Sequence, residues 1–256
     1  MPKNSLNQRR GIYLLPNLFT TAALFSGFYA IVASINGRFE AAAIAIFIAM
    51  ILDGMDGRVA RMTNTQSDFG AEYDSLSDMI SFGLAPALII YQWGLTGFGR
   101  VGWVAAFVYT AAAALRLARF NTQVETADKN YFQGLPSPSA AGIVVALVWI
   151  GEEYKLEPSG ALSIVAMVVT ILAGILMISN VRYNSFKSID LKGKVPFVHI
   201  LAVVLVFVLV SLEPPSVLFM LFMAYALSGP VMTLFQLKKH RARRSNSEDS
   251  SYEEKG

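Results

Sequence analysis

The sequence has no cysteine, only two histidines and few charged residues, and each shortage excludes a class of protein. Without cysteine the chain forms no disulfide framework and no thiolate-held metal site, and His199 and His240 are too few for an imidazole-rich site. Any bound metal must therefore be held by oxygen. Charged residues make up 15% of the chain and hydrophobic residues 54%. Because a soluble domain usually has about 25% charged residues, the composition indicates an integral membrane protein.

Long apolar segments separated by polar breaks predict an all-α polytopic membrane protein with about eight transmembrane helices. A bilayer core about 30 Å thick requires about 20 apolar residues in a helix. The fifth segment is the weakest, because Glu152 and Glu153 follow it closely. The expected spans are Ile12 to Ile35, Phe39 to Met62, Gly70 to Trp93, Val101 to Arg119, Pro138 to Trp149, Gly160 to Val181, Val195 to Leu212 and Ser216 to Leu237.

The distribution of basic residues predicts that both termini are cytoplasmic. With the N-terminus inside, all of the 21 Lys and Arg residues except Arg38, Arg100 and Lys155 fall on the cytoplasmic side, as the positive-inside rule requires. The first apolar run is too long for a cleavable signal peptide. Residues 1–237 are thus expected to form one membrane domain. The tail, residues 238–256, is basic and then acidic, and we expect it to be cytoplasmic and disordered and to bind no nucleic acid.

Four aspartates occur where charge is costly. Asp53 and Asp56 lie three residues apart near the end of the second expected span, and Asp74 and Asp78 lie four apart near the start of the third. These spacings place each pair on one helix face, and the short link between the spans returns the chain to a similar depth. A carboxylate within a span costs roughly 2.5 to 3.5 kcal/mol. A single aspartate would be read as a helix cap, but four together indicate a site for two divalent cations with oxygen ligands.

Small residues beside the carboxylates leave room for a ligand. Gly54 and Gly57 are poor helix formers that remove side chains from this stretch, and Ala60 extends the cleared strip. Arg61 returns to the face of Asp53 and could pair with a phosphate or a carboxylate.

The spacing of these residues resembles the signature of the CDP-alcohol phosphatidyltransferase family, D-x2-D-G-x2-A-R-x8-G-x3-D-x3-D. Residues 12 to about 181 resemble the six-helix core of that family, and the last two spans resemble a C-terminal extension found in one of its branches. The segments RLARFN at 116–121 and GLPSP at 134–138 resemble the bacterial branch that forms phosphatidylserine. The matching signature residues are Asp53, Asp56, Gly57, Ala60, Arg61, Gly70, Asp74 and Asp78.

The resemblance implies transfer of the phosphatidyl group from CDP-diacylglycerol to the hydroxyl of L-serine, giving phosphatidylserine and CMP. It implies a homodimer in the bacterial cytoplasmic membrane, with the active site near the cytoplasmic leaflet. Two divalent ions, Mg²⁺ or Mn²⁺, would be held by Asp53, Asp56 and Asp74. Asp78 would lie near the second ion and act as the general base toward the acceptor hydroxyl.

Binding of the two substrates is expected to involve further residues of the same stretches. The resemblance implies that Gly57, Ala60 and Arg61 contact the CDP moiety. Candidate contacts for the acceptor or a phosphate are Arg116, Arg119 and Asn121.

Several alternatives stay open at the level of sequence. The two arginines of RLARFN are equally consistent with residues that set topology and reach lipid phosphates. Glycerol 3-phosphate, inositol phosphate and choline are alternative acceptors for the same reaction type. A divalent-cation transporter would also carry aspartates within its spans, but these would line a path through the membrane rather than cluster at one side.

Overall fold

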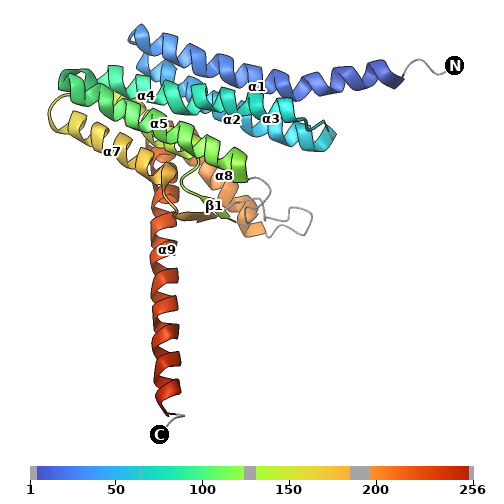
Figure 1. Cartoon of the computed structure of the whole chain (residues 1–256). Helices are drawn as coiled ribbons and strands as arrows, with labels where there is room; N and C mark the ends of the chain where they lie inside the picture. The colour runs from blue at the N-terminus through green and yellow to red at the C-terminus, as the bar shows by residue number, and fades with distance from the viewer. Residues whose placement is uncertain (1–4, 64, 124–130, 185–196, 254–256) are drawn as a thin grey trace.

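The structure is a computed structural model that describes residues 5–63, 65–123, 131–184 and 197–253. Almost all of these residues are helical (Figure 1). The helices are α1 (Ser5–Ile35), α2 (Phe39–Thr63), α3 (Asp68–Asp78), η1 (Met79–Leu84), α4 (Ala85–Ile90), η2 (Tyr91–Leu95), η3 (Thr96–Phe98), α5 (Arg100–Gln123), α6 (Ser137–Glu153), α7 (Ala161–Ile178), α8 (Phe197–Leu212) and α9 (Pro214–Glu253). The strands are β1 (Tyr131–Gln133) and β2 (Arg182–Asn184).

Helices occupy each of the stretches where the sequence predicts a span. Five of them are long and apolar enough to cross a membrane, namely Pro16–Ile35, Asp68–Phe98, Arg100–Thr122, Ala161–Ile178 and Pro214–Thr233, and Val203–Leu212 is a shorter apolar helix. Two further helices at expected spans are not among these. The second half of α2 carries aspartates and arginines, which makes the helix less apolar, and α6 is short, with 17 residues. The structure thus agrees with a helical membrane protein, whereas the count of eight spans and the cytoplasmic termini remain predictions.

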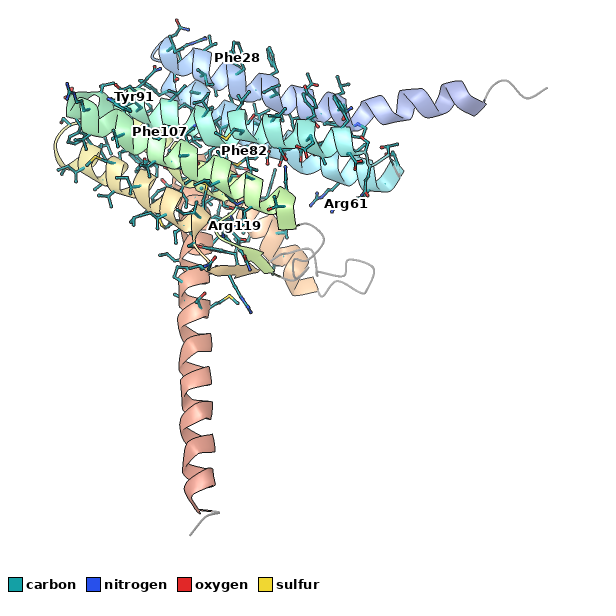
Figure 2. The ribbon with its side chains drawn as sticks, in the orientation of Figure 1. Phe28, Arg61, Phe82, Tyr91, Phe107 and Arg119 are labelled. Atoms are coloured by element: carbon teal, nitrogen blue, oxygen red, sulfur yellow. The ribbon has the colours of Figure 1, made fainter. Side chains whose placement is uncertain are left out.

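Large apolar side chains project outward from the bundle, as a lipid-facing surface requires. Phe28 on α1 and Phe107 on α5, both labelled in Figure 2, are 59% and 61% exposed. Inside the bundle the residues are smaller. Four alanines of α2 are buried against neighbouring helices, including Ala45, whose carbonyl accepts a 2.7 Å hydrogen bond from the hydroxyl of Ser26 on α1. Small residues let helices approach closely where no hydrophobic effect drives them together.

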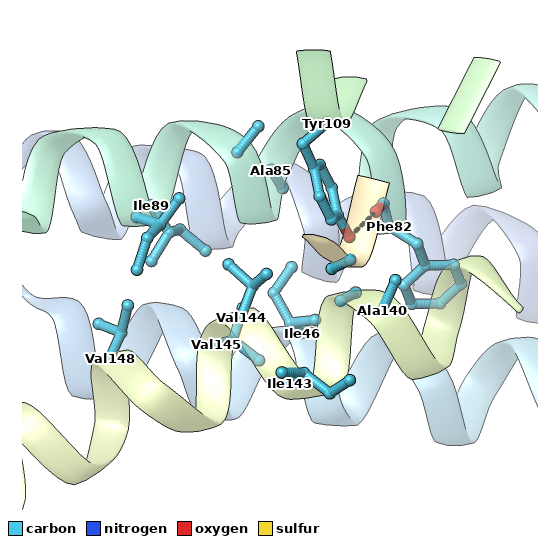
Figure 3. Packing of buried hydrophobic residues seen from close by; sticks show 14 of the residues in the cluster. Ile46, Phe82, Ala85, Ile89, Tyr109, Ala140, Ile143, Val144, Val145 and Val148 are labelled. Carbon is cyan, nitrogen blue, oxygen red and sulfur yellow. Dashed lines mark hydrogen bonds between the residues drawn. The ribbon is translucent and has the colours of Figure 1, made fainter. Parts of the chain in front are cut away.

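Helix α6 forms the centre of the bundle and packs against α2, α4, α7 and α9. Its residues from Ala140 to Val148 are all buried. Figure 3 shows Val144 and Val148 of α6 facing Ile46 of α2 and Ile89 of α4. The apolar character of α6 on all sides follows from this central position.

The helical segment from Asp68 to Phe98 widens just after the last aspartate of the signature. Residues Met79–Leu84 form a π-helical stretch, η1. A wider turn leaves some carbonyls without their usual intrahelical partner, and the hydroxyl of Tyr109 donates a 3.0 Å hydrogen bond to the carbonyl of Phe82 within it (Figure 3). This bond ties α5 to the segment that follows Asp78.

A short antiparallel pair of strands, which the sequence did not predict, joins the segment before α6 to the segment after α7. Phe132 of β1 lies opposite Tyr183 of β2. Gly134 follows β1 with φ +77°, and its amide donates a 2.8 Å hydrogen bond to the carbonyl of Val181. Three residues per strand are too few to show an alternating pattern in the sequence. The all-α prediction therefore holds for the bundle but omits this element.

The C-terminal helix differs from the prediction of a disordered tail. Helix α9 continues to Glu253 and extends away from the bundle in Figure 1. Between Pro230 and Gly256 the sequence contains neither proline nor glycine, so no residue that breaks a helix interrupts it.

Candidate active site

Three of the four signature aspartates bring their carboxylates together where α2 and α3 meet. One carboxylate oxygen each from Asp53, Asp56 and Asp74 lies within 4.8 Å of the other two. The link between the helices is short, and Ser67, the residue before α3, caps the helix because its hydroxyl accepts a 3.1 Å hydrogen bond from the amide of Gly70. This cap fixes the start of α3, so that Asp74 lies beside the two carboxylates of α2.

Asp78 lies one helical turn beyond Asp74 and belongs to the same cluster. Its carboxyl group is within hydrogen-bonding range of Asp53 and interacts electrostatically with Asp74. The Oδ1 atoms of Asp74 and Asp78 are buried and have no hydrogen-bond partner among the described residues. Buried carboxylate oxygens without partners are costly unless a cation neutralises them. The donor set consists only of oxygens, two of which are unpaired among the described residues, and therefore fits divalent cations such as Mg²⁺ or Mn²⁺.

A threonine of α1 completes the surroundings of the cluster. The hydroxyl of Thr20 donates a 2.7 Å hydrogen bond to Oδ2 of Asp56, and both residues are buried. The carbonyl of Thr20 in turn accepts a 3.2 Å hydrogen bond from the hydroxyl of Ser77. Sequence reasoning missed Thr20, because a threonine inside an apolar span carries no signal beyond ordinary helix packing.

The face of α2 next to the aspartates is open. A Cβ atom built on Gly54 or on Gly57 meets nothing within 4 Å among the described residues. Ala60 is half-buried and Arg61 is exposed, and Figure 2 places Arg61 near the end of α2. No packing contact with the described residues explains these glycines, which is consistent with space for a ligand.

Arg119 and Asn121, near the end of α5, both make contacts with other helices. The guanidinium of Arg119 donates hydrogen bonds to the carbonyls of Ile178 and Ser179 at the end of α7. Asn121 is exposed, and its amide nitrogen donates a 3.1 Å hydrogen bond to the hydroxyl of Ser75 on α3. These contacts join α5 to its neighbours, and a role for either residue in binding the acceptor or a phosphate remains a prediction.

Arg116 lies one turn earlier on α5 and faces the aspartate cluster. It interacts electrostatically with Asp78, and its Nη1 donates a 2.9 Å hydrogen bond to the hydroxyl of Ser137, the first residue of α6. Its Nε is buried without a hydrogen-bond partner among the described residues. Among the three candidate residues on α5, Arg116 combines an electrostatic interaction with Asp78 and a buried donor that has no partner among the described residues.

The candidate site lies in the part of the chain that is similar to known proteins. A family model described as CDP-alcohol phosphatidyltransferase matches residues 13–178. The chain belongs to this family. The resemblance noted in the sequence is thus confirmed, and the four aspartates and Arg116 all lie within the matched region. Helices α8 and α9 lie outside it.

Relatives within the CDP-alcohol phosphatidyltransferase family share much of the chain. A CDP-diacylglycerol–serine O-phosphatidyltransferase of Helicobacter pylori is 40% identical over 89% of this chain and 94% of its own length. One from Methanocaldococcus jannaschii is 35% identical over 72% of this chain and 80% of its own. The crystal structure of Mycobacterium tuberculosis phosphatidylinositol phosphate synthase with CDP-DAG bound superposes with a TM-score of 0.50 at 18% identity, covering 65% of this chain and 82% of that one. At that identity the likeness concerns the fold.

Proposed function

We propose that this member of the CDP-alcohol phosphatidyltransferase family transfers the phosphatidyl group of CDP-diacylglycerol to the hydroxyl of L-serine, giving phosphatidylserine and CMP. The observation that carries the proposal is the convergence of Asp53, Asp56 and Asp74, with Asp78 beside them. The choice of serine is supported by the relatives named for serine transfer, which include one that is 40% identical over most of the chain.

The carboxylates of Asp53, Asp56 and Asp74 would hold two divalent cations, Mg²⁺ or Mn²⁺. Four negative charges in one partly buried pocket repel one another strongly, and two divalent ions balance them. The chemistry supplied by such ions is neutralisation of the pyrophosphate and of the charge that develops on the leaving CMP. Thr20 would keep Asp56 in a ligating orientation through its hydrogen bond to Oδ2.

Asp78 would act as the general base. Its carboxylate would accept the proton of the serine hydroxyl as that oxygen bonds to the lipid-side phosphorus, while the bond from this phosphorus to the CMP oxygen breaks. The unpartnered Oδ1 of Asp78 supports this role, because it leaves an acceptor position that no described residue fills. Arg116 lies beside it and opposes the negative charge of the cluster.

The CDP moiety would lie along the open face of α2. Gly57 and Ala60 offer little steric obstruction there, and the exposed guanidinium of Arg61 is available to a phosphate. Loss of the glycine or of the arginine would then weaken binding of CDP-diacylglycerol rather than of serine.

We place the enzyme in the bacterial cytoplasmic membrane as a homodimer with eight spans and both termini in the cytoplasm. The positive-inside distribution of Lys and Arg supports this topology. It puts the aspartate cluster near the cytoplasmic leaflet, so that the acyl chains of the substrate remain in the bilayer while its pyrophosphate reaches the carboxylates.

The test is a transferase assay with purified protein in detergent or liposomes. CDP-diacylglycerol and Mg²⁺ or Mn²⁺ are supplied with a single alcohol, and CMP and lipid products are measured. We expect CMP and phosphatidylserine with L-serine. Release of CMP with inositol phosphate, glycerol 3-phosphate or choline but not with serine would replace the acceptor and keep the reaction type. Metal flux into liposomes without CMP release would instead favour a divalent-cation transporter.

A further inference from the structure

Arg116 is a cation whose hydrogen-bonding capacity is only partly used. One of its guanidinium nitrogens is held by the hydroxyl of Ser137, which is fully buried. Its Nε has no partner among the described residues, although it is shielded from solvent. A buried guanidinium N–H without an acceptor costs free energy, so the arrangement is best satisfied by an anionic group that arrives from outside the chain.

A tyrosine from the C-terminal helix reaches the same place. Tyr225 of α9 is close enough to Arg116 for the two side chains to interact electrostatically. Tyr225 lies outside residues 13–178, the part of the chain that the family model matches. The helix beyond the shared core therefore contributes a polar group next to the arginine that faces Asp78.

Close packing on both sides holds Tyr225 in position. One turn before it, Phe222 packs so closely on Gly142 of α6 that a Cβ there would lie 2.8 Å from its ring. One turn after it, Gly229 packs against the ring of Tyr183 in β2. Phe222, Tyr225 and Gly229 follow helical spacing and share one face of α9.

The strand β2 adds a second constraint on the same helix. The hydroxyl of Tyr183 donates a 3.0 Å hydrogen bond to the carbonyl of Ala226, and its ring contacts that of Tyr225 with 5.5 Å between centroids. Burial raises the pKa of Tyr183 to about 12, so this hydroxyl stays protonated and able to donate at neutral pH. The position of Tyr225 is thus fixed by contacts with α6 and with β2.

We propose that Arg116 and Tyr225 form the subsite for the carboxylate of the amino-acid acceptor, with Ser137 as the positioning residue of Arg116. This proposal rests on the proposed function and names the groups that select an acceptor with an α-carboxylate. Arg116 donates hydrogen bonds from its guanidinium to the carboxylate. Tyr225 donates from its phenolic hydroxyl, and the hydroxyl-bearing end of serine is then directed toward Asp78.

The subsite accounts for selectivity by its charge and by its burial. An alcohol of similar size that lacks the carboxylate leaves the buried Nε of Arg116 without an acceptor, and such a loss discriminates more strongly than a change in shape. Serinol, in which a hydroxymethyl group replaces the carboxylate of serine, is therefore the appropriate probe.

The test compares serine with serinol in the wild type and in three variants, with KM for serine, KM for CDP-diacylglycerol and kcat measured separately. Arg116→Gln is expected to raise KM for serine about 10- to 100-fold, as loss of a charged hydrogen bond does, and to remove the preference for serine over serinol. Arg116→Lys keeps the charge and is expected to recover part of that preference. Tyr225→Phe is expected to raise KM for serine about 3- to 10-fold, with KM for CDP-diacylglycerol unchanged.

Tyr154→Phe is the matched control, because it also removes a tyrosine hydroxyl that contacts α9. That hydroxyl donates a hydrogen bond to Glu213, just before the start of α9, and lies 3.5 Å from the hydroxyl of Ser216 within α9. We expect its KM for serine to equal that of the wild type. Wild-type enzyme that uses serinol as well as serine would overturn the subsite, as would a Tyr225→Phe variant that changes only the KM for CDP-diacylglycerol. Wild-type enzyme with no serine-dependent CMP release would instead overturn the proposed function itself.

Discussion

The hydroxyl of Thr20 on α1 lies 2.7 Å from Oδ2 of Asp56 on α2 and donates a hydrogen bond to it. The bond links the first helix of the bundle to the proposed metal site. The same carboxylate of Asp56 has an oxygen within 4.8 Å of one oxygen each of Asp53 and Asp74. The orientation of a ligating carboxylate depends on such outer contacts, and their loss typically costs 10- to 100-fold in metal affinity.

We therefore expect Thr20→Val to weaken metal binding with little effect on the fold. Valine has nearly the same shape but lacks the hydroxyl, so the Mn²⁺ concentration for half-maximal activity should rise about 10-fold. Titration of CMP release against free Mn²⁺ measures this. The matched control is Thr170→Val, which removes a buried hydroxyl that bonds only within α7. Equal Mn²⁺ dependence in both variants would contradict a role for Thr20 in orienting Asp56.

Replacement of Asp78 tests the proposed general base. Asp78→Asn keeps the size of the side chain but cannot accept a proton from the acceptor, and we expect kcat to fall about 10²- to 10⁴-fold. Circular dichroism and thermal unfolding should show a folded protein. Asp68→Asn, which changes an exposed aspartate in the first turn of α3, is the control. An Asp78→Asn variant with near wild-type turnover would remove the general base from the mechanism.

The metal stoichiometry of the cluster can be measured directly. Chelation should abolish CMP release, and added Mg²⁺ or Mn²⁺ should restore it, because the carboxylates repel one another without cations. We expect about two Mn²⁺ per chain in the wild type, since two divalent ions balance four carboxylates, and fewer in Asp56→Asn. Glu72→Gln, at an exposed position of α3 outside the cluster, serves as the control. Full activity after exhaustive chelation would contradict the proposed metal site.

The aspartate cluster could be predicted from the sequence because it depends on residues that are close together in the chain. The spacing of Asp53 and Asp56, and of Asp74 and Asp78, fixes each pair on one helix face, and a short link brings the two faces together. The apolar stretches likewise predicted where the helices lie, because a bilayer requires a minimum length of apolar helix.

The contacts that support the site are non-local, and the sequence did not reveal them. Thr20 bonds to a residue 36 positions away, and Arg116 to one 21 positions away. Tyr225 approaches Arg116 from a helix that belongs to the C-terminal extension. No sequence pattern around a threonine or tyrosine in an apolar span indicates which residue it contacts. The contacts of Thr20 and Tyr225 are therefore seen only in the packing of the bundle.

The strand pair was missed because three residues per strand show no alternating pattern, but the turn at Gly134 allows its role to be tested. Its φ of +77° lies in the left-handed region, and a Cβ there would collide with the carbonyl oxygen of Met177. Gly134→Ala should therefore strain the turn by about 1 to 2 kcal/mol from the backbone alone, with the collision in addition. The turn precedes Ser137, which holds Arg116. We expect a lower unfolding temperature together with a higher KM for serine.

Gly97→Ala provides the matched control for this substitution. A Cβ at Gly97 meets nothing within 4 Å among the described residues, and its φ lies outside the left-handed region. The unfolding temperature of Gly97→Ala should equal that of the wild type when both are followed by tryptophan fluorescence in the same detergent. If Gly134→Ala unfolded at the wild-type temperature, the turn would tolerate a side chain. The strand pair would then not be the element that holds the start of α6 and, with it, the hydroxyl of Ser137 that bonds Arg116.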